Sequence, residues 1–580
     1  MGYVKRCGIG SMNIPRRYLL GLFLVAVTLR WIAQPPLSVW PLCFVALVPF
    51  LALVEIRSRF SRRDYLGFWL AATLFWLVSL QGIRHANPLM YGGWFLLSAY
   101  LAVYMPLFIA LTRTLRRRSV PLVASAPIIW VGLETIRNYF ATGISAAMLG
   151  HSLADVPVSI QIADLFGSYG VSFVIVTVNV VVFLIASKIR PAFSSKWFSD
   201  APGRGHVVTA SAYASGLLAA TIGYGSYRLS EPSPEQRSER LATFALIQRS
   251  EPVEYQQNSI REQEIFQQYA RDSITAFEQT PEPIDVVVWP ESMFTGGYPW
   301  MIAESDAMVP ELFEGSASEF TLAIDSFRDY FLSRTADVQN VLGLENGNEG
   351  KPHLIVGCGV IHYHKQTNIY SGIVHVGAKG NVQDWYAKNH LVMFGEYIPI
   401  IRSIPWIRDF VPDGLMITAG EGPVPMQVGN TVVLPSICIE TAVERVTINQ
   451  IRELHGEGKT PDVVVTVTND GWFDDSSIID HHRRCAQLIA VGARRPILSA
   501  ANNGPTAWID HCGRVIDSVA TGSNGSIIAA PMRETRMSLY VKIGDWPAKI
   551  LALACIVALL DRLRRKTEII PLFGKKPATK

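Results

Sequence analysis

Long apolar stretches at both ends of the chain constrain its fold more than any other feature. Residues 1–228 and 544–563 carry runs of Leu, Val, Phe and Ala, whereas 235–540 has a mixed composition typical of soluble domains. A helix needs about 20 mostly apolar residues to cross the hydrocarbon core of a bilayer. The pattern therefore predicts a multi-pass α-helical membrane domain with an inserted soluble domain. Candidate spans lie at 18–33, 38–55, 65–83, 92–112, 120–136, 168–187, 207–226 and 545–560.

These spans divide the chain into four regions. The composition agrees with a membrane protein, because 49% hydrophobic residues and only 17% charged residues are too apolar for a soluble globule. The net charge of +4 is small, and no basic face with aromatic platforms is evident, so we expect no nucleic-acid partner. The regions are a membrane domain at 1–228 with about seven transmembrane helices, a soluble domain at 235–540, a C-terminal transmembrane helix at 545–560 and a basic cytoplasmic tail at 561–580.

Lysines and arginines are distributed asymmetrically among the short connections. If the N-terminus is cytoplasmic, the inside flanks hold nearly all of them, and Arg84 and Arg137 are the main exceptions outside. The positive-inside rule then places the domain at 235–540 on the extracytoplasmic face. A cleaved signal peptide at 1–34 is the alternative, but its apolar run ends at Arg30 and a poor cleavage site follows.

The soluble domain alternates short β-branched runs with helical patterns. This alternation favours an α/β fold with largely buried strands. The stretch 295–350 is only partly helical in pattern, and we interpret it as a surface insertion or a lid. Predicted strands are 241–248, 285–289, 353–360, 371–377, 431–439, 462–470, 496–502 and 525–530. Predicted helices are 254–279, 319–337, 440–455 and 478–493.

Three residues that could perform chemistry lie at the ends of strand-like runs: Glu291 follows DVVVWP, Lys388 follows VQDWYA, and Cys438 lies at the end of TVVLPSI before a predicted helix. Catalytic groups in α/β sheets gather at such strand ends. We expect the turn into a helix to lower the pKa of the Cys438 thiol, and a half-apolar pocket to raise the pKa of Glu291 so that it serves as a base. Lys388 and the backbone N–H of Ile439 would stabilise an oxyanion. Together these groups could transfer an acyl group through a thioester.

Each of these residues also has a structural interpretation. A cysteine on a buried strand is commonly a small hydrophobe, and a lysine after a strand is commonly solvated. The seven cysteines include no C-x-x-C pair, so neither a zinc ribbon nor a disulfide framework is suggested.

Two histidine pairs are candidate metal ligands. His362 and His364 lack a matching second cluster, and the pair His481-His482 is interpreted as a solvated face or a substrate-side contact. We therefore expect no metal and no cofactor.

Four motifs in the soluble domain resemble, in order and spacing, the Glu-Lys-Cys signature of the nitrilase superfamily. They are V-V-W-P-E-S (287–292), Y-A-K-N-H-L-V-M-F-G-E-Y-I-P (386–399), I-C-I-E (437–440) and T-N-D-G-W-F (468–473). With the spans and with Q-I-A-D-L-F-G-S-Y-G-V-S-F (161–173), the chain resembles the apolipoprotein N-acyltransferase family over nearly its whole length. The resemblance implies a nitrilase-like αββα sandwich on the extracytoplasmic side of a multi-pass membrane domain.

The same resemblance implies a role for each motif residue. Glu291 would be the general base, Lys388 the oxyanion stabiliser and Cys438 the nucleophile. Glu396 and Glu440 would support them, and Ile439 stands where the family usually has Tyr. Residues expected to line the substrate pocket are Phe394, Asn469 and Trp472.

The implied reaction has two steps. Cys438 would take an acyl chain from a phospholipid, typically phosphatidylethanolamine, and pass it to the N-terminal amine of an S-diacylglyceryl-cysteine on an apolipoprotein. The implied location is the bacterial inner membrane, with the catalytic domain on the periplasmic face. Two alternatives remain: a membrane-tethered nitrilase-like amidase acting on a soluble C–N substrate, and a non-catalytic receptor that keeps the fold as a binding module.

Overall fold

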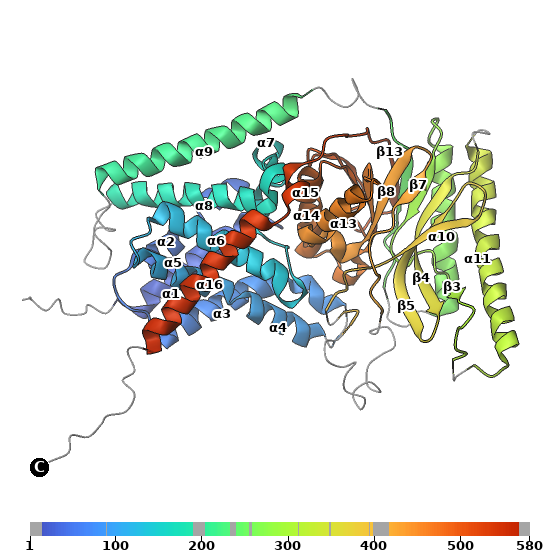
Figure 1. The fold of residues 1–580 in the computed structure, drawn as a ribbon, viewed down its shortest axis with the longest axis horizontal. Coiled ribbons are helices and arrows are strands. Elements are labelled where there is room, and N and C mark those ends of the chain that lie inside the picture. Colours follow the sequence, from blue (N-terminus) through green and yellow to red (C-terminus); the bar gives the residue numbers. More distant parts are fainter. Residues whose placement is uncertain are drawn as a thin grey trace, which may run out of the picture.

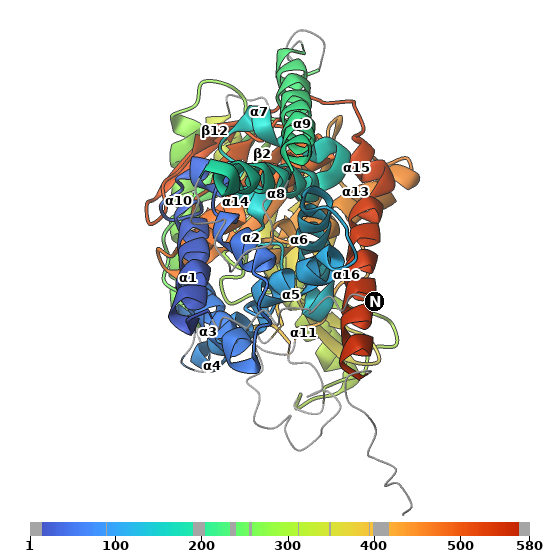
Figure 2. The same cartoon turned by 90° about the vertical axis from the view of Figure 1, so that its left-hand side faces the viewer.

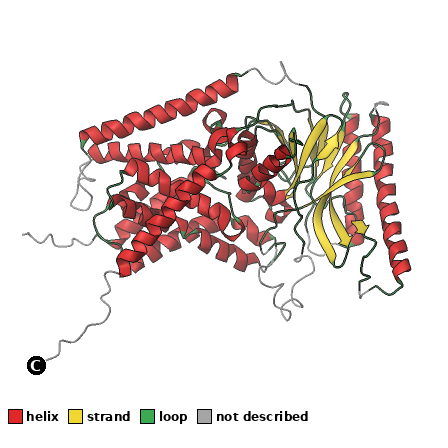
Figure 3. Ribbon diagram, in the orientation of Figure 1, coloured by secondary structure: helices red, strands yellow, loops and turns green. Residues whose placement is uncertain are grey.

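A helical bundle and an α/β domain form separate halves of the molecule. The structure is a computed structural model that describes residues 14–86, 88, 90–189, 203–231, 239–253, 258–310, 313–346, 350–393, 395–397 and 417–567. Figure 1 shows a bundle of helices at one end and a layered α/β domain at the other. Strands are confined to the second half (Figure 3), as the hydrophobicity pattern predicts.

All eight predicted spans fall on helices of the bundle. These helices are α1 (Arg16–Ile32), η1 (Trp40–Phe44), α2 (Val48–Glu55), α3 (Arg62–Ser79), η2 (Gln81–His85), α4 (Met90–Leu101), α5 (Tyr104–Arg116), α6 (Leu122–Tyr139), η3 (Phe140–Thr142), η4 (Leu149–Leu153), α7 (Pro157–Ile160), α8 (Ala163–Ile189), α9 (Arg204–Ser230) and α16 (Trp546–Thr567). Three helices among the described residues are long and apolar enough to cross a membrane by length and composition, namely Met90–Arg116, Ala163–Ile189 and Arg204–Ser230. Trp40–Glu55 is a shorter apolar helix. The count of eight spans stays a prediction.

The helices are apolar on their outer as well as their inner faces. On α3, Leu66, Leu70 and Leu74 are 53–57% exposed, while Phe68 and Phe75 on the opposite face are buried. Exposed apolar side chains at a spacing of four residues form a continuous stripe along a helix. A large exposed apolar surface of this kind marks contact with a membrane or a partner.

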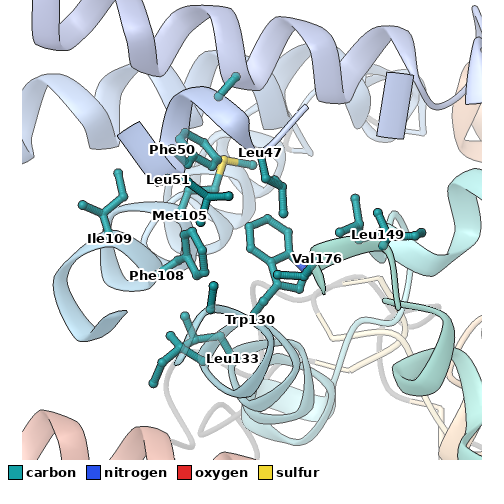
Figure 4. Packing of buried hydrophobic residues seen from close by; sticks show 14 of the residues in the cluster. Leu47, Phe50, Leu51, Met105, Phe108, Ile109, Trp130, Leu133, Leu149 and Val176 are labelled. Atoms are coloured by element: carbon teal, nitrogen blue, oxygen red, sulfur yellow. The ribbon is translucent and has the colours of Figure 1, made fainter. Parts of the chain in front are cut away.

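Large side chains from four helices fill the centre of the bundle. Figure 4 shows Phe50 of α2, Phe108 of α5, Trp130 of α6 and Val176 of α8 among the buried residues of this cluster. The rings of Phe108 and Trp130 meet edge to face with centroids 5.0 Å apart. Figure 2 shows the bundle end-on, with α16 beside α5 and α6, so the last helix completes the packing of the first ones.

Arg30 interrupts the first predicted span without breaking α1. The side chain is 3% exposed and donates a hydrogen bond to the Ala147 carbonyl at 2.7 Å. Its guanidinium also lies within 6 Å of the ring centres of Phe75, Trp76 and Trp130. A cation over aromatic faces is attracted by their negative charge distribution. The charge is therefore accommodated inside the bundle.

The soluble domain is an αββα sandwich, as the resemblance implied. One sheet has the strand order β13-β1-β2-β4-β5-β6, with β3 pairing with β4, and the other has the order β12-β11-β10-β9-β8-β7. The strands are β1 (Phe244–Gln248), β2 (Val286–Trp289), β3 (Trp300–Ala303), β4 (His353–Tyr363), β5 (Thr367–Val376), β6 (Val382–Ala387), β7 (Met426–Val428), β8 (Thr431–Ile437), β9 (Val463–Asn469), β10 (Ile497–Asn502), β11 (Ala507–Ile509), β12 (Val515–Ser518) and β13 (Gly525–Ala529).

Helices cover the outer face of each sheet. Helices α10 (Ser259–Glu278) and α11 (Ala317–Glu345) pack on the first sheet, and α13 (Glu444–Gly456) and α14 (Ser477–Ala493) pack on the second. Between the sheets, Leu246 and Val288 from one side meet Val465 and Leu498 from the other in a fully buried cluster. Strands buried on both faces read as continuous apolar runs, and for this reason all eight predicted strands are found.

Two expectations about the soluble domain need correction. The stretch 295–350 is neither a surface insertion nor a lid, because most of it forms α11, whose Phe331 and Leu342 are fully buried against the first sheet. The helix predicted at 440–455 begins at Glu444, since residues 438–441 form the short 3-10 helix η9 (Cys438–Thr441).

The helix predicted at 254–279 corresponds to α10. Residues 254–257 lie outside the described residues. Helix α10 begins after Asn258, whose side chain caps the Arg261 N–H at 2.8 Å.

The segment 161–173 docks the sandwich onto the bundle. Arg494 after α14 pairs with Asp164 at 2.7 Å, and both side chains are at most 1% exposed. Gly167 adopts a φ of +62°, where α8 bends, and the following Ser168 N–H donates to Glu444 at 3.0 Å. Burial raises the pKa of Glu444 to about 7, while the hydrogen bonds from Ser168 counteract the rise. This segment is thus a joint between the two halves, built from buried charge pairs and a bend.

Candidate active site

The three predicted catalytic residues lie where the two sheets meet. Glu291 lies two residues beyond β2, Lys388 directly follows β6, and Cys438 directly follows β8. Strands β2 and β6 belong to one sheet and β8 to the other. The sequence-based expectation that these side chains gather at strand ends is therefore matched by their positions.

Lys388 lies between two carboxylates. Its Nζ is 3.2 Å from Oε1 of Glu291 and 2.6 Å from Oε1 of Glu396, and the lysine is only 1% exposed. Burial alone would lower the pKa of Lys388, but the charges of Glu291 and Glu396 outweigh it and raise the pKa well above its usual value. The lysine is therefore a permanently charged group, able to stabilise an oxyanion.

Glu291 has the environment of a proton acceptor with a raised pKa. Burial raises its pKa, Lys388 lowers it and the nearby Glu396 raises it again, with a net increase above 4.5. The Ser371 hydroxyl donates to Oε1 of Glu291 at 3.0 Å. Gly357 of β4 lies directly behind this residue, and a Cβ there would lie 2.5 Å from the Cα of Glu291. The Ser371 hydroxyl and the Lys388 ammonium both donate to Oε1 and so fix the direction of the carboxylate.

Cys438 is the one cysteine among the described residues that is not fully buried. It has a φ of +49°, and Ser292 beside Glu291 has a φ of +67°, so both catalytic turns hold a non-glycine residue in a sparsely populated backbone region. Such strain persists where the surrounding structure enforces it, and it is concentrated at functional sites. The turn presents the thiol at the seam between the sheets.

The expected lowering of the Cys438 pKa is wrong. Burial raises the pKa of the thiol to about 12, Lys388 lowers it, and Glu291 and Asp470 raise it further. The physical reason is burial, and the opposing effect of a helix N-terminus is weak here, because Cys438 begins the four-residue 3-10 helix η9 rather than α13. Cys438 therefore rests as a protonated thiol, and any attack by its sulfur requires a group that accepts the proton.

Glu440 ties the nucleophile turn to the lysine loop. Its Oε2 accepts from the Ile437 N–H at 2.7 Å, and its Oε1 accepts from the Asn389 N–H at 2.7 Å and from the Tyr386 hydroxyl at 2.8 Å. The carboxylate is fully buried, and burial raises its pKa against the hydrogen bonds that lower it. The supporting role of Glu440 in the reaction stays a prediction.

His482 is a site residue whose role the sequence did not reveal. Its Nε2 lies 3.0 Å from the Cys438 carbonyl and 3.0 Å from the Thr441 hydroxyl. The interpretation of His481 and His482 as a solvated face is wrong, because His481 is 2% exposed and the His482 side chain 14% exposed. Helix α14 is wedged between the second sheet and the bundle, which buries both rings.

Of the three residues predicted to line the substrate pocket, two lie among the described residues. Phe394 lies outside the described residues. Asn469 is buried and accepts a hydrogen bond from the Asn502 side chain at 2.9 Å, which is a structural contact between the ends of β9 and β10. Trp472 is half-buried in η10 (Asp470–Phe473), which packs against η2 of the bundle. Pocket roles for these residues stay predictions.

The αββα sandwich belongs to a known class of domain. Residues 245–544 match the family Carbon-nitrogen hydrolase. An amidase of the nitrilase superfamily from Nesterenkonia is 13% identical, with a TM-score of 0.34, and the alignment covers 53% of this chain and 96% of that one.

The helical part narrows this class to one family. Residues 26–181 match the Apolipoprotein N-acyltransferase N-terminal domain. A relative named apolipoprotein N-acyltransferase from Rhodopirellula baltica is 45% identical over 91% of this chain and 94% of its own length. A relative of the same name from Geobacter metallireducens is 27% identical over 94% of each chain. The chain belongs to the apolipoprotein N-acyltransferase family.

Proposed function

We propose that this chain N-acylates apolipoproteins through a thioester on Cys438, with phosphatidylethanolamine as acyl donor and the amine of an S-diacylglyceryl-cysteine as acceptor. Membership of the family supports the acyltransferase activity, with a lipid donor and a lipoprotein acceptor. The observation that carries the mechanism is the buried array in which Lys388 contacts Glu291 and Glu396 beside the partly accessible thiol.

The first step forms the thioester. Glu291 accepts the proton of the Cys438 thiol as sulfur attacks the ester carbonyl of the donor, and the raised pKa of Glu291 suits it to hold that proton. Lys388 and the backbone N–H of Ile439 stabilise the resulting oxyanion. The C–O bond then breaks, Glu291 returns the proton to the leaving alkoxide, and a lysophospholipid departs.

The second step transfers the acyl chain. The amine of the acceptor attacks the thioester carbonyl, Glu291 takes one proton from the attacking nitrogen, and the C–S bond breaks. The thiolate recovers a proton from Glu291, so the enzyme returns to its starting state and the product is an amide. A stored thioester lets two lipid substrates use one site in turn. Glu396 keeps a negative charge beside Lys388 while Glu291 is protonated.

Contacts at the two ends of the bundle support the proposed orientation. At the end away from the sandwich, charged residues of the predicted cytoplasmic flanks pair with one another: Arg116 with Glu55 at 2.6 Å, Arg118 with Asp561, and Arg16 with Asp64 at 3.4 Å. At the other end, the sandwich contacts the end of α6 and the start of α8, both predicted to be outside. We therefore place the bundle in the bacterial inner membrane and the sandwich on the periplasmic face.

The proposed domain boundaries follow the same arrangement. The membrane domain is 1–228, the catalytic domain 235–540, the last span 545–560 and the cytoplasmic tail 561–580. Helix α16 continues to Thr567, so the tail begins as helix, and residues 568–580 lie outside the described residues.

The activity is tested by reconstituting the full chain with phosphatidylethanolamine and a diacylglyceryl lipopeptide. We expect an N-acylated lipopeptide and a lysophospholipid in equal amounts, and neither product with Cys438→Ala. An amidase would release an acid from a soluble amide and would need no phospholipid. Release of free fatty acid without N-acylated peptide would contradict the proposal.

A further inference from the structure

Two histidines at the end of β4 face two carboxylates from the turn that follows β3. His362 lies near the end of β4, and His364 directly follows the strand. In the parallel ladder between β3 and β4, Ile302 lies beside His362. The Glu304 N–H donates to the Tyr363 carbonyl at 3.0 Å. This pairing brings Glu304 and Asp306 next to the two rings.

The facing atoms converge on a small volume. His362 Nε2 lies 3.1 Å from Oε1 of Glu304, and His364 Nδ1 lies 3.4 Å from Oε2 of the same carboxylate and 3.5 Å from Oδ1 of Asp306. Ligand atoms of Glu304, Asp306 and His364 all lie within 4.8 Å of one another. The cluster thus offers two nitrogen and two carboxylate donors.

The geometry of the rings distinguishes this cluster from ordinary surface ion pairs. His362 Nε2 and His364 Nδ1 are buried atoms, and neither has a hydrogen-bond partner among the residues that the structure describes. Buried ring nitrogens are normally satisfied by hydrogen bonds. A metal ion bound by His364 would satisfy its ring nitrogen, and the exposed Glu304 and Asp306 leave a route from solvent.

The observed separations match those of a tetrahedral site. Nitrogen and oxygen ligands about 2.0–2.1 Å from Zn²⁺ lie about 3.3 Å from one another across a tetrahedral edge. The two separations from His364 Nδ1, 3.4 Å to Glu304 and 3.5 Å to Asp306, lie close to that value. Imidazole with carboxylate suits zinc and related transition metals, whereas Ca²⁺ and Mg²⁺ prefer oxygen ligands alone.

We propose that Glu304, Asp306 and His364 bind one divalent transition-metal ion, for which Zn²⁺ is the best match, while His362 contacts the other oxygen of Glu304 and orients that carboxylate. The ion fastens the turn after β3 to the hairpin between β4 and β5. The histidines alone showed no second cluster in the sequence, because the carboxylates come from another strand.

The test measures zinc bound to the full-length protein in detergent, purified without a histidine tag. Protein is stripped with a chelator, incubated with Zn²⁺, desalted and measured by elemental mass spectrometry. We expect one zinc per chain in the wild type and loss of that zinc in the double variant His362→Ala/His364→Ala. His455→Ala is the matched control, because the ring of this exposed histidine at the end of α13 contacts the Thr460 hydroxyl, far from the cluster in sequence, and the variant should leave one zinc bound. Absence of zinc from the wild type, or equal zinc in the double variant, would overturn the proposal.

A second measurement keeps the outcome decisive if the double variant folds poorly. Zn²⁺ should raise the melting midpoint of the chelator-treated wild type, because a ligand that binds only the folded state stabilises it. Glu304→Gln replaces the carboxylate with an amide of the same shape and should abolish that shift while the protein stays monodisperse. If Zn²⁺ raised the melting midpoint of Glu304→Gln as much as that of the wild type, the zinc would be bound elsewhere in the protein. Neither readout depends on acyl transfer, so it is independent of the proposed function.

Discussion

Lys388 lies closer to Glu396 than to Glu291: its Nζ is 2.6 Å from Oε1 of the former and 3.2 Å from Oε1 of the latter. Glu396 also accepts the Val392 N–H at 2.8 Å, so its direction is fixed by the backbone. Glu396 is thus the fixed counterion of the lysine. Because Glu396 balances the charge of Lys388, Glu291 is available in the proposed mechanism to exchange a proton with the substrate and the thiol.

Glu396→Gln should slow thioester formation by about 10²-fold, because a displaced catalytic group loses that much when it moves by about 1 Å. The rate is followed by mass spectrometry of the acylated protein after mixing with phospholipid. Glu457→Gln is the matched control, since Glu457 lies 3.2 Å from Lys459 in an exposed pair. Wild-type rates for Glu396→Gln would show that this carboxylate does not position the lysine.

The rate of thioester formation should fall in mildly acidic solution. Glu291 works as a base only when deprotonated, and its pKa is raised above 4.5 mainly by burial. Activity should therefore be complete above that raised pKa and be lost as the pH falls through it, earlier than for an ordinary glutamate. Glu291→Gln should lower the rate by about 10²–10⁴-fold and remove this acidic limb. A wild-type profile that stays flat through the acidic range would argue against Glu291 as the base.

Glu440→Gln should destabilise the sandwich as well as slow the reaction. Both oxygens of Glu440 accept N–H donors, so an amide NH₂ must face one of them, either Ile437 or Asn389. A buried donor left without an acceptor costs about 1–3 kcal/mol. The unfolding midpoint, measured in detergent by the change in tryptophan fluorescence, should therefore decrease. An unchanged midpoint would mean that the nucleophile turn does not depend on this carboxylate.

Gly167→Ala should weaken the joint between the bundle and the sandwich. The residue has a φ of +62°, and a Cβ there would lie 2.6 Å from Oε1 of Glu444 and 2.5 Å from the ring of Tyr540. Gly21→Ala is the matched control, because a Cβ on that α1 residue meets nothing within 4 Å. We expect lower stability and faster proteolysis between the halves for Gly167→Ala alone. Equal behaviour of the two variants would show that the bend in α8 tolerates a side chain.

Much of the fold follows from the sequence because its signals are local. Apolar runs predicted both the helices and the buried strands, and the strand-like runs before Glu291, Lys388 and Cys438 predicted that these residues lie at strand ends. Short edge strands such as β12 were missed, since four residues give little periodicity.

Features that depend on long-range contact could not be predicted in this way. The high pKa of Cys438 arises from burial between two sheets, and His482 reaches the Cys438 carbonyl from a helix that follows another strand. The same holds for Glu304 beside His364, since only the pairing of β3 with β4 brings them together.

The most direct test of the central claim is the mass of the intact protein after incubation with phosphatidylethanolamine alone. The account predicts one added fatty acyl group, located on Cys438 by peptide mapping, absent from Cys438→Ala and removed when the diacylglyceryl lipopeptide is added. The other cysteines that the structure describes are buried and provide an internal comparison. A wild-type protein that N-acylates the lipopeptide while Cys438 stays unmodified, or a Cys438→Ala protein that is acylated to the same extent, would contradict the account.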